Sequence, residues 1–83
     1  MKKTKYYFTF GSDPRYPFQG GWAEVWAVSL NHAIKIFREK YPDRDKGIVN
    51  CADFYTRRQF EMTGMLQEGN RGTYCHEVLG EEA

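Results

Sequence analysis

The sequence predicts a single α+β domain with the element order ββαβαβ, in which helices pack on one face of a mostly antiparallel four-stranded sheet. Four short segments have the composition of strands, and one segment between them spaces its apolar residues as a helix does. No linker, internal repeat or low-complexity segment interrupts the 83 residues. Helices on one face of such a sheet bury the apolar surfaces of both layers. We therefore expect residues 1–83 to form one unit, with flexible ends at 1–4 and 80–83.

The first two strands are expected at residues 5–11 and 21–29. In the first segment, strand alternation places three aromatic side chains on one face. In the second, alanine and valine side chains fill one face, which suits packing under a helix, whereas Trp22 and Trp26 point to the other face. If no second layer covers these tryptophans, they leave an apolar patch suited to a dimer contact or a ligand.

A helix is expected to start after Ser29, whose hydroxyl can accept a hydrogen bond from an N–H of the first turn. Apolar residues recur along one helical face at positions 30, 33, 34, 37 and 41. Pro42 ends the helix because it has no N–H to donate and restricts the residue before it.

The second half of the chain predicts shorter elements. Thr56, followed three residues later by Gln59, matches a capping box and indicates the start of a short helix. The elements after the first helix are a strand, this short helix, a turn and a last strand, expected in that order at 48–55, 57–66, 68–72 and 73–79.

Charge and cysteine usage limit the classes of function. Twelve Lys and Arg residues against eleven Asp and Glu residues leave a net charge of +1, whereas a nucleic-acid-binding protein generally needs a basic surplus. The absence of a long apolar run and of a signal-peptide pattern predicts a cytoplasmic protein without membrane contact. Cys51 and Cys75 are expected to be reduced thiols, with a single disulfide between them as the alternative.

Few residues have a pattern that indicates catalysis. Cys51 could be activated by His32 or His76, but no nucleophile signature surrounds either cysteine. The two cysteines and two histidines also lack the paired spacing of zinc modules. Glu24 lies within an apolar strand, where burial would raise its carboxyl pKa unless a basic neighbour pairs with it. We expect a protein that is not an enzyme and that needs no metal and no cofactor.

The loop between the first two strands is the strongest candidate for a binding site. It holds an arginine between aromatic residues, a combination suited to stacking on a base while contacting a phosphate. The alternative is that its aromatic residues fold back as a lid on the core. The predicted binding residues of this loop and the strand after it are Ser12, Asp13, Arg15, Tyr16, Phe18, Trp22 and Trp26.

A basic cluster on the two helices is a second candidate, for contact with an anionic partner. A solvated helix face is the commoner explanation of such charges. The members of this cluster are Lys35, Arg38, Lys40, Arg57 and Arg58.

Several segments resemble a group of small uncharacterised proteins of Firmicutes-type bacteria that occur in phage and other mobile-element contexts. The segments are the string YYFTFGSDPRYPF, the alanine- and valine-rich strand, the helix that ends at Tyr41 and Pro42, and the strand VNCADFY. The resemblance covers roughly residues 5–60 and is most specific at FGSDP. It implies an accessory or counter-defence protein in a bacterial host cell, which inhibits a host defence protein such as a CRISPR nuclease or sequesters a nucleotide signal. No catalytic residue is carried over, because the group has no established activity.

The sequence therefore predicts a small non-enzymatic protein that binds a host protein or a small nucleotide and associates as a homodimer. Its contact surface would be the loop from Arg15 to Trp22 together with the aromatic sheet face. Two alternatives remain: a nucleic-acid-binding module that stacks bases on the aromatic sheet face, and a small hydrolase centred on Glu24 or Cys51.

Overall fold

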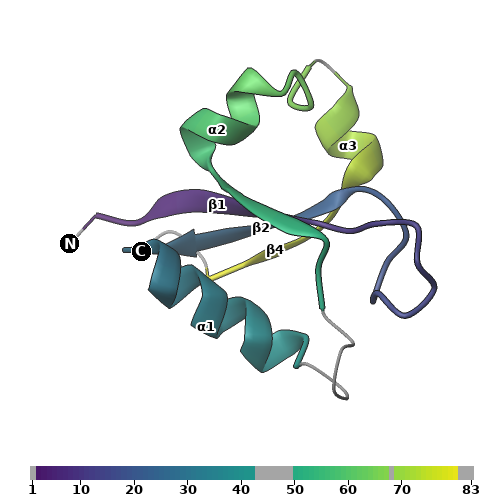
Figure 1. The fold of residues 1–83 in the computed structure, drawn as a ribbon. Helices are drawn as coiled ribbons and strands as arrows, with labels where there is room; N and C mark the ends of the chain where they lie inside the picture. Colours follow the sequence, from purple (N-terminus) through teal and green to yellow (C-terminus); the bar gives the residue numbers. More distant parts are fainter. Residues whose placement is uncertain (1, 43–49, 68, 81–83) are drawn as a thin grey trace.

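The computed structural model describes residues 2–42, 50–67 and 69–80, which form one α+β domain (Figure 1). The predicted class and the order ββαβαβ are confirmed, with one additional short helix before the last strand. The elements in chain order are β1 (Thr4–Thr9), β2 (Trp22–Ala27), α1 (Leu30–Lys40), β3 (Asp53–Thr56), α2 (Arg57–Met62), α3 (Asn70–Tyr74) and β4 (Cys75–Leu79).

The four strands form one sheet in the order β3-β1-β2-β4. β1 pairs antiparallel with both β2 and β3, so the sheet is mostly antiparallel, as predicted. β4 runs parallel to β2. A parallel neighbour needs a crossover connection, and α2 and α3 provide it between β3 at one end of the sheet and β4 at the other.

The helices lie on both faces of the sheet, which corrects the expectation that they pack on one face. α1 covers one face, and α2 and α3 lie over the other (Figure 1). Strand alternation is the physical reason, because Phe8 of β1 faces α1 whereas its neighbour Tyr7 faces α2. Both faces of β1 carry aromatic side chains, so both need a covering layer.

The layer under α1 contains the larger hydrophobic core. Phe8 stacks on Phe37 of α1, with 4.4 Å between ring centroids. The small side chains Ala23, Val25 and Ala27 of β2 are fully buried in the same cluster. Their position under α1 is the one that the sequence predicts, since small side chains let the helix approach the sheet closely.

The layer under α2 buries the aromatic residues of the opposite face. Tyr7 stacks on Phe60 of α2 with 4.3 Å between ring centroids, and Trp22 meets the same ring edge-on at 5.0 Å. Trp22 has no exposed surface, so it leaves no apolar patch. Trp26 is half-buried, and the Lys5 ammonium lies 5.3 Å from the centroid of its ring.

Both predicted helix caps are confirmed. The Ser29 hydroxyl accepts a hydrogen bond from the His32 N–H at 3.1 Å. Thr56 and Gln59 form the reciprocal capping box at the start of α2. α2 ends at Met62, earlier than expected, because the chain turns at Gly64, which has a φ of +78°.

Two expectations in the second half of the chain are corrected. The sequence predicts a turn at 68–72, of which residue 68 lies outside the described residues, but α3 begins at Asn70, and Arg71 within it reaches across to Glu24. This contact joins distant parts of the chain, so local turn propensity does not reveal it. The third strand was expected at 48–55, but it starts later, at Asp53, and ends one residue later, at Thr56; residues 48 and 49 lie outside the described residues.

Candidate functional site

The predicted binding loop is held by a local ion pair at its tip. Arg15 donates from Nε and Nη2 to the carboxylate of Asp13, at 3.1 and 2.8 Å, and its backbone N–H donates to the same carboxylate at 2.9 Å. These hydrogen bonds and the guanidinium charge lower the pKa of Asp13 to about 2. The Arg15 guanidinium, which the sequence suggests for a ligand, is therefore already paired with the Asp13 carboxylate. Ser12, next to Asp13 in the chain, is exposed.

The aromatic residues of the loop fold back onto the core. Phe18 stacks on His76 of β4 with 4.2 Å between ring centroids and meets Phe10 edge-on at 5.3 Å. Tyr16 also packs against the core under α1, and His76 Nε2 lies 2.8 Å from the Gly20 carbonyl oxygen. This geometry is that of the lid alternative: the two rings close one end of the core.

The residues predicted for one binding surface do not come together. Trp22 lies in the core under α2, and Trp26 lies farther along β2 beside Lys5. Tyr16 and Phe18 pack against the opposite cluster, under α1. The fold separates these aromatic side chains because strand alternation and the two helical layers send them to different faces.

Glu24 is a buried carboxylate with three partners. Arg71 contacts it at 3.0 Å, Lys5 at 3.6 Å, and the Trp22 indole N–H donates to it at 3.3 Å. Burial alone would raise its pKa, but the hydrogen bonds from Arg71 and Trp22 and the nearby positive charges outweigh burial and lower it. An ionised, paired carboxylate suits a structural role better than general acid catalysis.

The two cysteines lie on opposite faces of the sheet. Cys51 packs against the cluster under α1 and Cys75 against the cluster under α2, so the disulfide left open by the sequence does not form. Burial raises the pKa of the Cys75 thiol, and the Glu24 charge acts in the same direction. Within residues 2–42, 50–67 and 69–80, no group of three or more His, Cys, Asp or Glu side chains could hold a metal ion.

The basic residues of the helices do not form the single patch that was considered. Lys40 of α1 pairs with Glu77 of β4 at 3.4 Å. Arg57 of α2 pairs with Glu61 at 3.2 Å, one helical turn away. Because α1 and α2 cover opposite faces, their charges belong to different surfaces.

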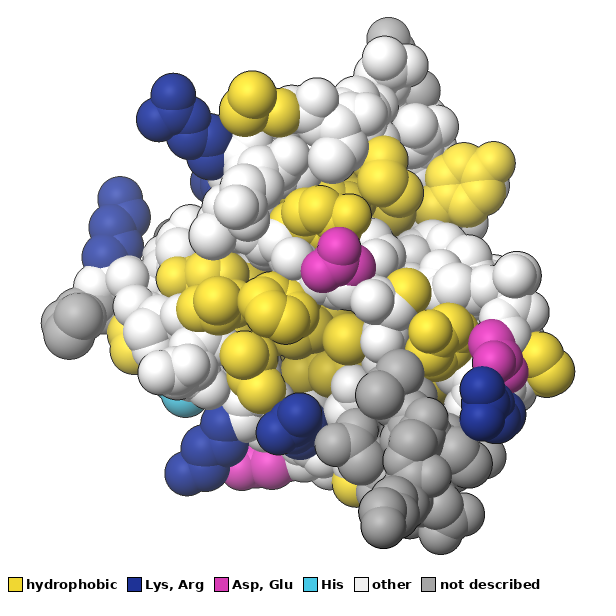
Figure 2. Space-filling view, in the orientation of Figure 1, with side chains coloured by type: hydrophobic (Ala, Val, Ile, Leu, Met, Phe, Trp, Pro, Cys, Tyr) yellow, Lys and Arg dark blue, Asp and Glu magenta, His cyan; other side chains and the backbone are white. Residues whose placement is uncertain are grey.

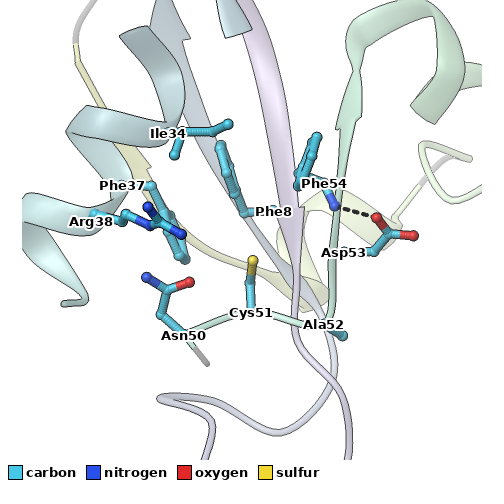
Figure 3. Close-up of a pocket in the computed structure, with 9 residues that line it drawn as sticks. All are labelled: Phe8, Ile34, Phe37, Arg38, Asn50, Cys51, Ala52, Asp53 and Phe54. Atoms are coloured by element: carbon cyan, nitrogen blue, oxygen red, sulfur yellow. Dashed lines mark hydrogen bonds between the residues drawn. The ribbon is translucent and has the colours of Figure 1, made fainter. Parts of the chain in front are cut away.

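A recess lies between α1 and β3, and we call it the α1–β3 hollow (Figure 3). Its apolar walls come from β1, α1 and β3, and its polar rim from α1 and the segment that leads into β3. In Figure 3 the Cys51 sulfur points into it between the rings of the wall. The lining residues are Phe8, Ile34, Phe37, Arg38, Asn50, Cys51, Ala52, Asp53 and Phe54.

The size of the α1–β3 hollow limits what it can hold. Its volume is about 180 Å³, and an apolar cavity of about 150 Å³ is enough for benzene. Phe54 at its mouth is 43% exposed although it is a large hydrophobic residue. Hydrophobic side chains also gather across the middle of the molecular face that carries α1 and β3 (Figure 2). The hollow therefore fits one phenyl-sized or branched aliphatic group.

Only weak signals in the sequence indicate this hollow. Ile34 and Phe37 belong to the predicted apolar face of α1, and Phe54 to a predicted strand. The sequence pattern places them on one face of a helix and one face of a strand, and none of the three is among the predicted binding residues. The signal that could have been used is the shortage of large side chains at Cys51 and Ala52, opposite the bulky face of the helix.

Comparison of the chain with protein-family models, curated proteins and solved structures found no match. Among the described residues, no helix has the length and apolar character that crossing a membrane requires.

Proposed function

We propose that this protein is a non-enzymatic binding protein that holds another protein by receiving one of its hydrophobic side chains in the α1–β3 hollow. The observation that carries the proposal is an apolar recess of about 180 Å³ with a large exposed aromatic residue, Phe54, at its mouth. Burying a phenylalanine or leucine side chain there would contribute roughly 1.5–3 kcal/mol to binding. Such a buried anchor is the usual centre of a protein interface.

The dimensions favour a protein partner over a small nucleotide. Sites for drug-sized ligands have volumes of roughly 300–1,000 Å³, and the α1–β3 hollow is smaller, at about 180 Å³. A nucleotide would leave most of its surface outside. A single side chain projecting from a partner would fit, and the rest of the partner could contact the rim.

The rim favours recognition through a side chain over addition of a strand. β3 is the last of the described strands on its side of the sheet. The Asp53 carboxylate accepts a hydrogen bond from the Phe54 N–H at 2.8 Å, so this backbone donor already has a partner. A charged side chain that accepts a hydrogen bond from the backbone of an edge strand, as Asp53 does, disfavours pairing with another strand.

The accessory or counter-defence role implied by the resemblance is retained as part of this proposal. A protein that acts by binding needs no catalytic group, and the paired state of Glu24 and the packing of the two thiols against opposite clusters favour structural roles. The nucleic-acid-binding alternative that stacks bases on the sheet face and the hydrolase alternative receive less support. Both faces of the sheet are covered by helices, which leaves little of the aromatic surface that base stacking would need.

The experiment fills the hollow and measures capture of the partner. Tagged wild-type protein and the variant Ile34→Trp are used to capture proteins from host-cell extract. Native mass spectrometry then measures the masses of the complexes in the eluates. The added indole should occupy the hollow, so the proposal predicts that a complex seen with the wild type is lost. Circular dichroism and thermal unfolding check that the variant is folded.

The matched control is Met62→Trp, which adds the same side chain at a position on α2 that is 80% exposed. The proposal predicts that this variant keeps the complex. A complex that survives Ile34→Trp in a folded protein, or that is lost equally in both variants, would show that the hollow is not the recognition site.

A further inference from the structure

Two adjoining hollows at the start of β1 gather basic side chains from distant parts of the chain. One has a volume of about 540 Å³ and is lined by Thr4, Tyr6, Thr56, Arg57, Arg58 and Glu61. The other has a volume of about 490 Å³ and is lined by Lys2, Lys3, Thr4, Trp26 and Arg57. Thr4 and Arg57 line both, so the two hollows form one continuous surface, which we call the basic groove.

Strand pairing brings the two halves of the basic groove together. Tyr6 of β1 is opposite Thr56 of β3 in the antiparallel ladder. The residues before β1 therefore lie beside the first residues of α2. Lysines at one end of the chain and arginines more than fifty residues away thus share a surface that the linear sequence does not reveal.

The charge of the basic groove differs from that of the whole chain. Its lining within the described residues holds four cations and one carboxylate, Glu61, which pairs with Arg57 at 3.2 Å. Among the described residues, Lys2 and Arg58 make no ion pair with an acidic side chain. The chain as a whole has a net charge of only +1, so the described lining of the groove is more basic than the chain as a whole.

We propose that the basic groove binds the phosphodiester backbone of a single-stranded nucleic acid. Spaced cations along an open surface suit successive phosphates, and the hydroxyls of Thr4 and Thr56 are additional hydrogen-bond donors. Trp26 is half-buried and lines the second hollow, where its indole, beside the Lys5 ammonium, could contact a base. The site is distinct from the α1–β3 hollow, since none of the described residues lines both.

The test measures binding of fluorescein-labelled (dT)12 by fluorescence anisotropy. If the groove neutralises three or four phosphates of the single strand, affinity for (dT)12 should fall about 20- to 50-fold between 50 and 200 mM salt. Arg58→Glu should weaken binding about tenfold, because it removes one phosphate contact and adds a repelling charge. Lys35→Glu, an equal change of charge at an exposed position of α1, should weaken it less than twofold if the groove is the site.

Competitors distinguish the source of the phosphate. Adenosine monophosphate and inorganic phosphate at 1 mM should displace little of the oligonucleotide, because each occupies only part of the groove. If adenosine monophosphate or inorganic phosphate displaced the labelled oligonucleotide as effectively as unlabelled (dT)12 does, the proposal would be overturned in favour of a mononucleotide or phosphate site. Equal losses in Arg58→Glu and Lys35→Glu, or binding to phosphatidylserine vesicles without binding to (dT)12, would also overturn it.

Discussion

The guanidinium of Arg71 lies against the fully buried carboxylate of Glu24, with Nε 3.0 Å from one carboxylate oxygen and Nη2 3.0 Å from the other. This pair joins α3 to β2, and Lys5 of β1 adds a second positive charge at 3.6 Å. A buried carboxylate is stable only when such partners replace its water. The contact therefore holds the crossover between β3 and β4 onto the sheet.

Removing the guanidinium should destabilise the fold. Arg71→Ala leaves the Glu24 carboxylate buried with fewer hydrogen-bond donors, so we expect the free energy of unfolding to fall by about 1–3 kcal/mol. This loss is smaller than for a fully buried ion pair because the arginine side chain is half exposed. Urea unfolding followed by circular dichroism measures it. Arg58→Ala, an exposed arginine of α2, is the control and should change stability by less than about 0.5 kcal/mol. Equal effects of the two changes would contradict the role given to the pair.

The same carboxylate predicts how stability depends on pH. Because the folded state lowers the pKa of Glu24, its ionisation contributes stability that is fully present above the unfolded-state pKa of about 4.3 and is lost as the pH falls through the folded-state pKa. Wild type should therefore lose more stability than Glu24→Gln between pH 7 and pH 3. Urea midpoints across this range measure the difference, and parallel curves for the two proteins would count against it.

The lid geometry of the loop predicts its protection from proteases. Phe18→Ala removes the ring that stacks on His76 and meets Phe10, so the loop should open more often and trypsin should cleave faster after Arg15. Limited proteolysis with mass spectrometry of the fragments measures the rate. Ser12→Ala, at an exposed position of the same loop, is the control. An unchanged cleavage rate in Phe18→Ala would mean that the ring does not close the loop.

Two neighbouring glycines provide a matched test of the contact between the loop and β4. Gly20 and Gly21 have φ values of +74° and +75°, which L side chains rarely adopt, so alanine should cost about 1 kcal/mol at either position. At Gly21 a Cβ would also clash with the Tyr74 carbonyl, whereas at Gly20 it would meet open space. Gly21→Ala should therefore lower the melting temperature more than Gly20→Ala. Equal melting temperatures would contradict this packing.

Local patterns predicted the elements of the fold, and long-range contacts decided their arrangement. The Ser29 cap, the Thr56–Gln59 capping box and the small residues under α1 follow from neighbouring residues, and the structure confirms each. The division of helices between the two faces depends on which residues α2 meets, as in the stacking of Tyr7 on Phe60. No local rule specifies that pairing.

The candidate sites were harder to predict because they are formed by residues far apart in the chain. The loop attracted attention for its aromatic content, yet Phe18 and Tyr16 pack against the core. The α1–β3 hollow requires Phe8, Ile34 and Phe54 to meet, and the basic groove requires Lys2 and Arg57 to meet. Composition and spacing contain no information on those distances until the strand order is known.

Photo-crosslinking from the mouth of the α1–β3 hollow tests the central claim most directly. The photoreactive amino acid p-benzoylphenylalanine is placed at Phe54, which lines the hollow, or at Met62, which lies outside it and is more exposed. Irradiation in host-cell extract is followed by mass spectrometry of the tagged protein. If a partner protein binds through the hollow, we expect one discrete protein adduct from position 54 and none from position 62. The same adduct from position 62, or no adduct at position 54 where the wild type forms a complex, would contradict the claim.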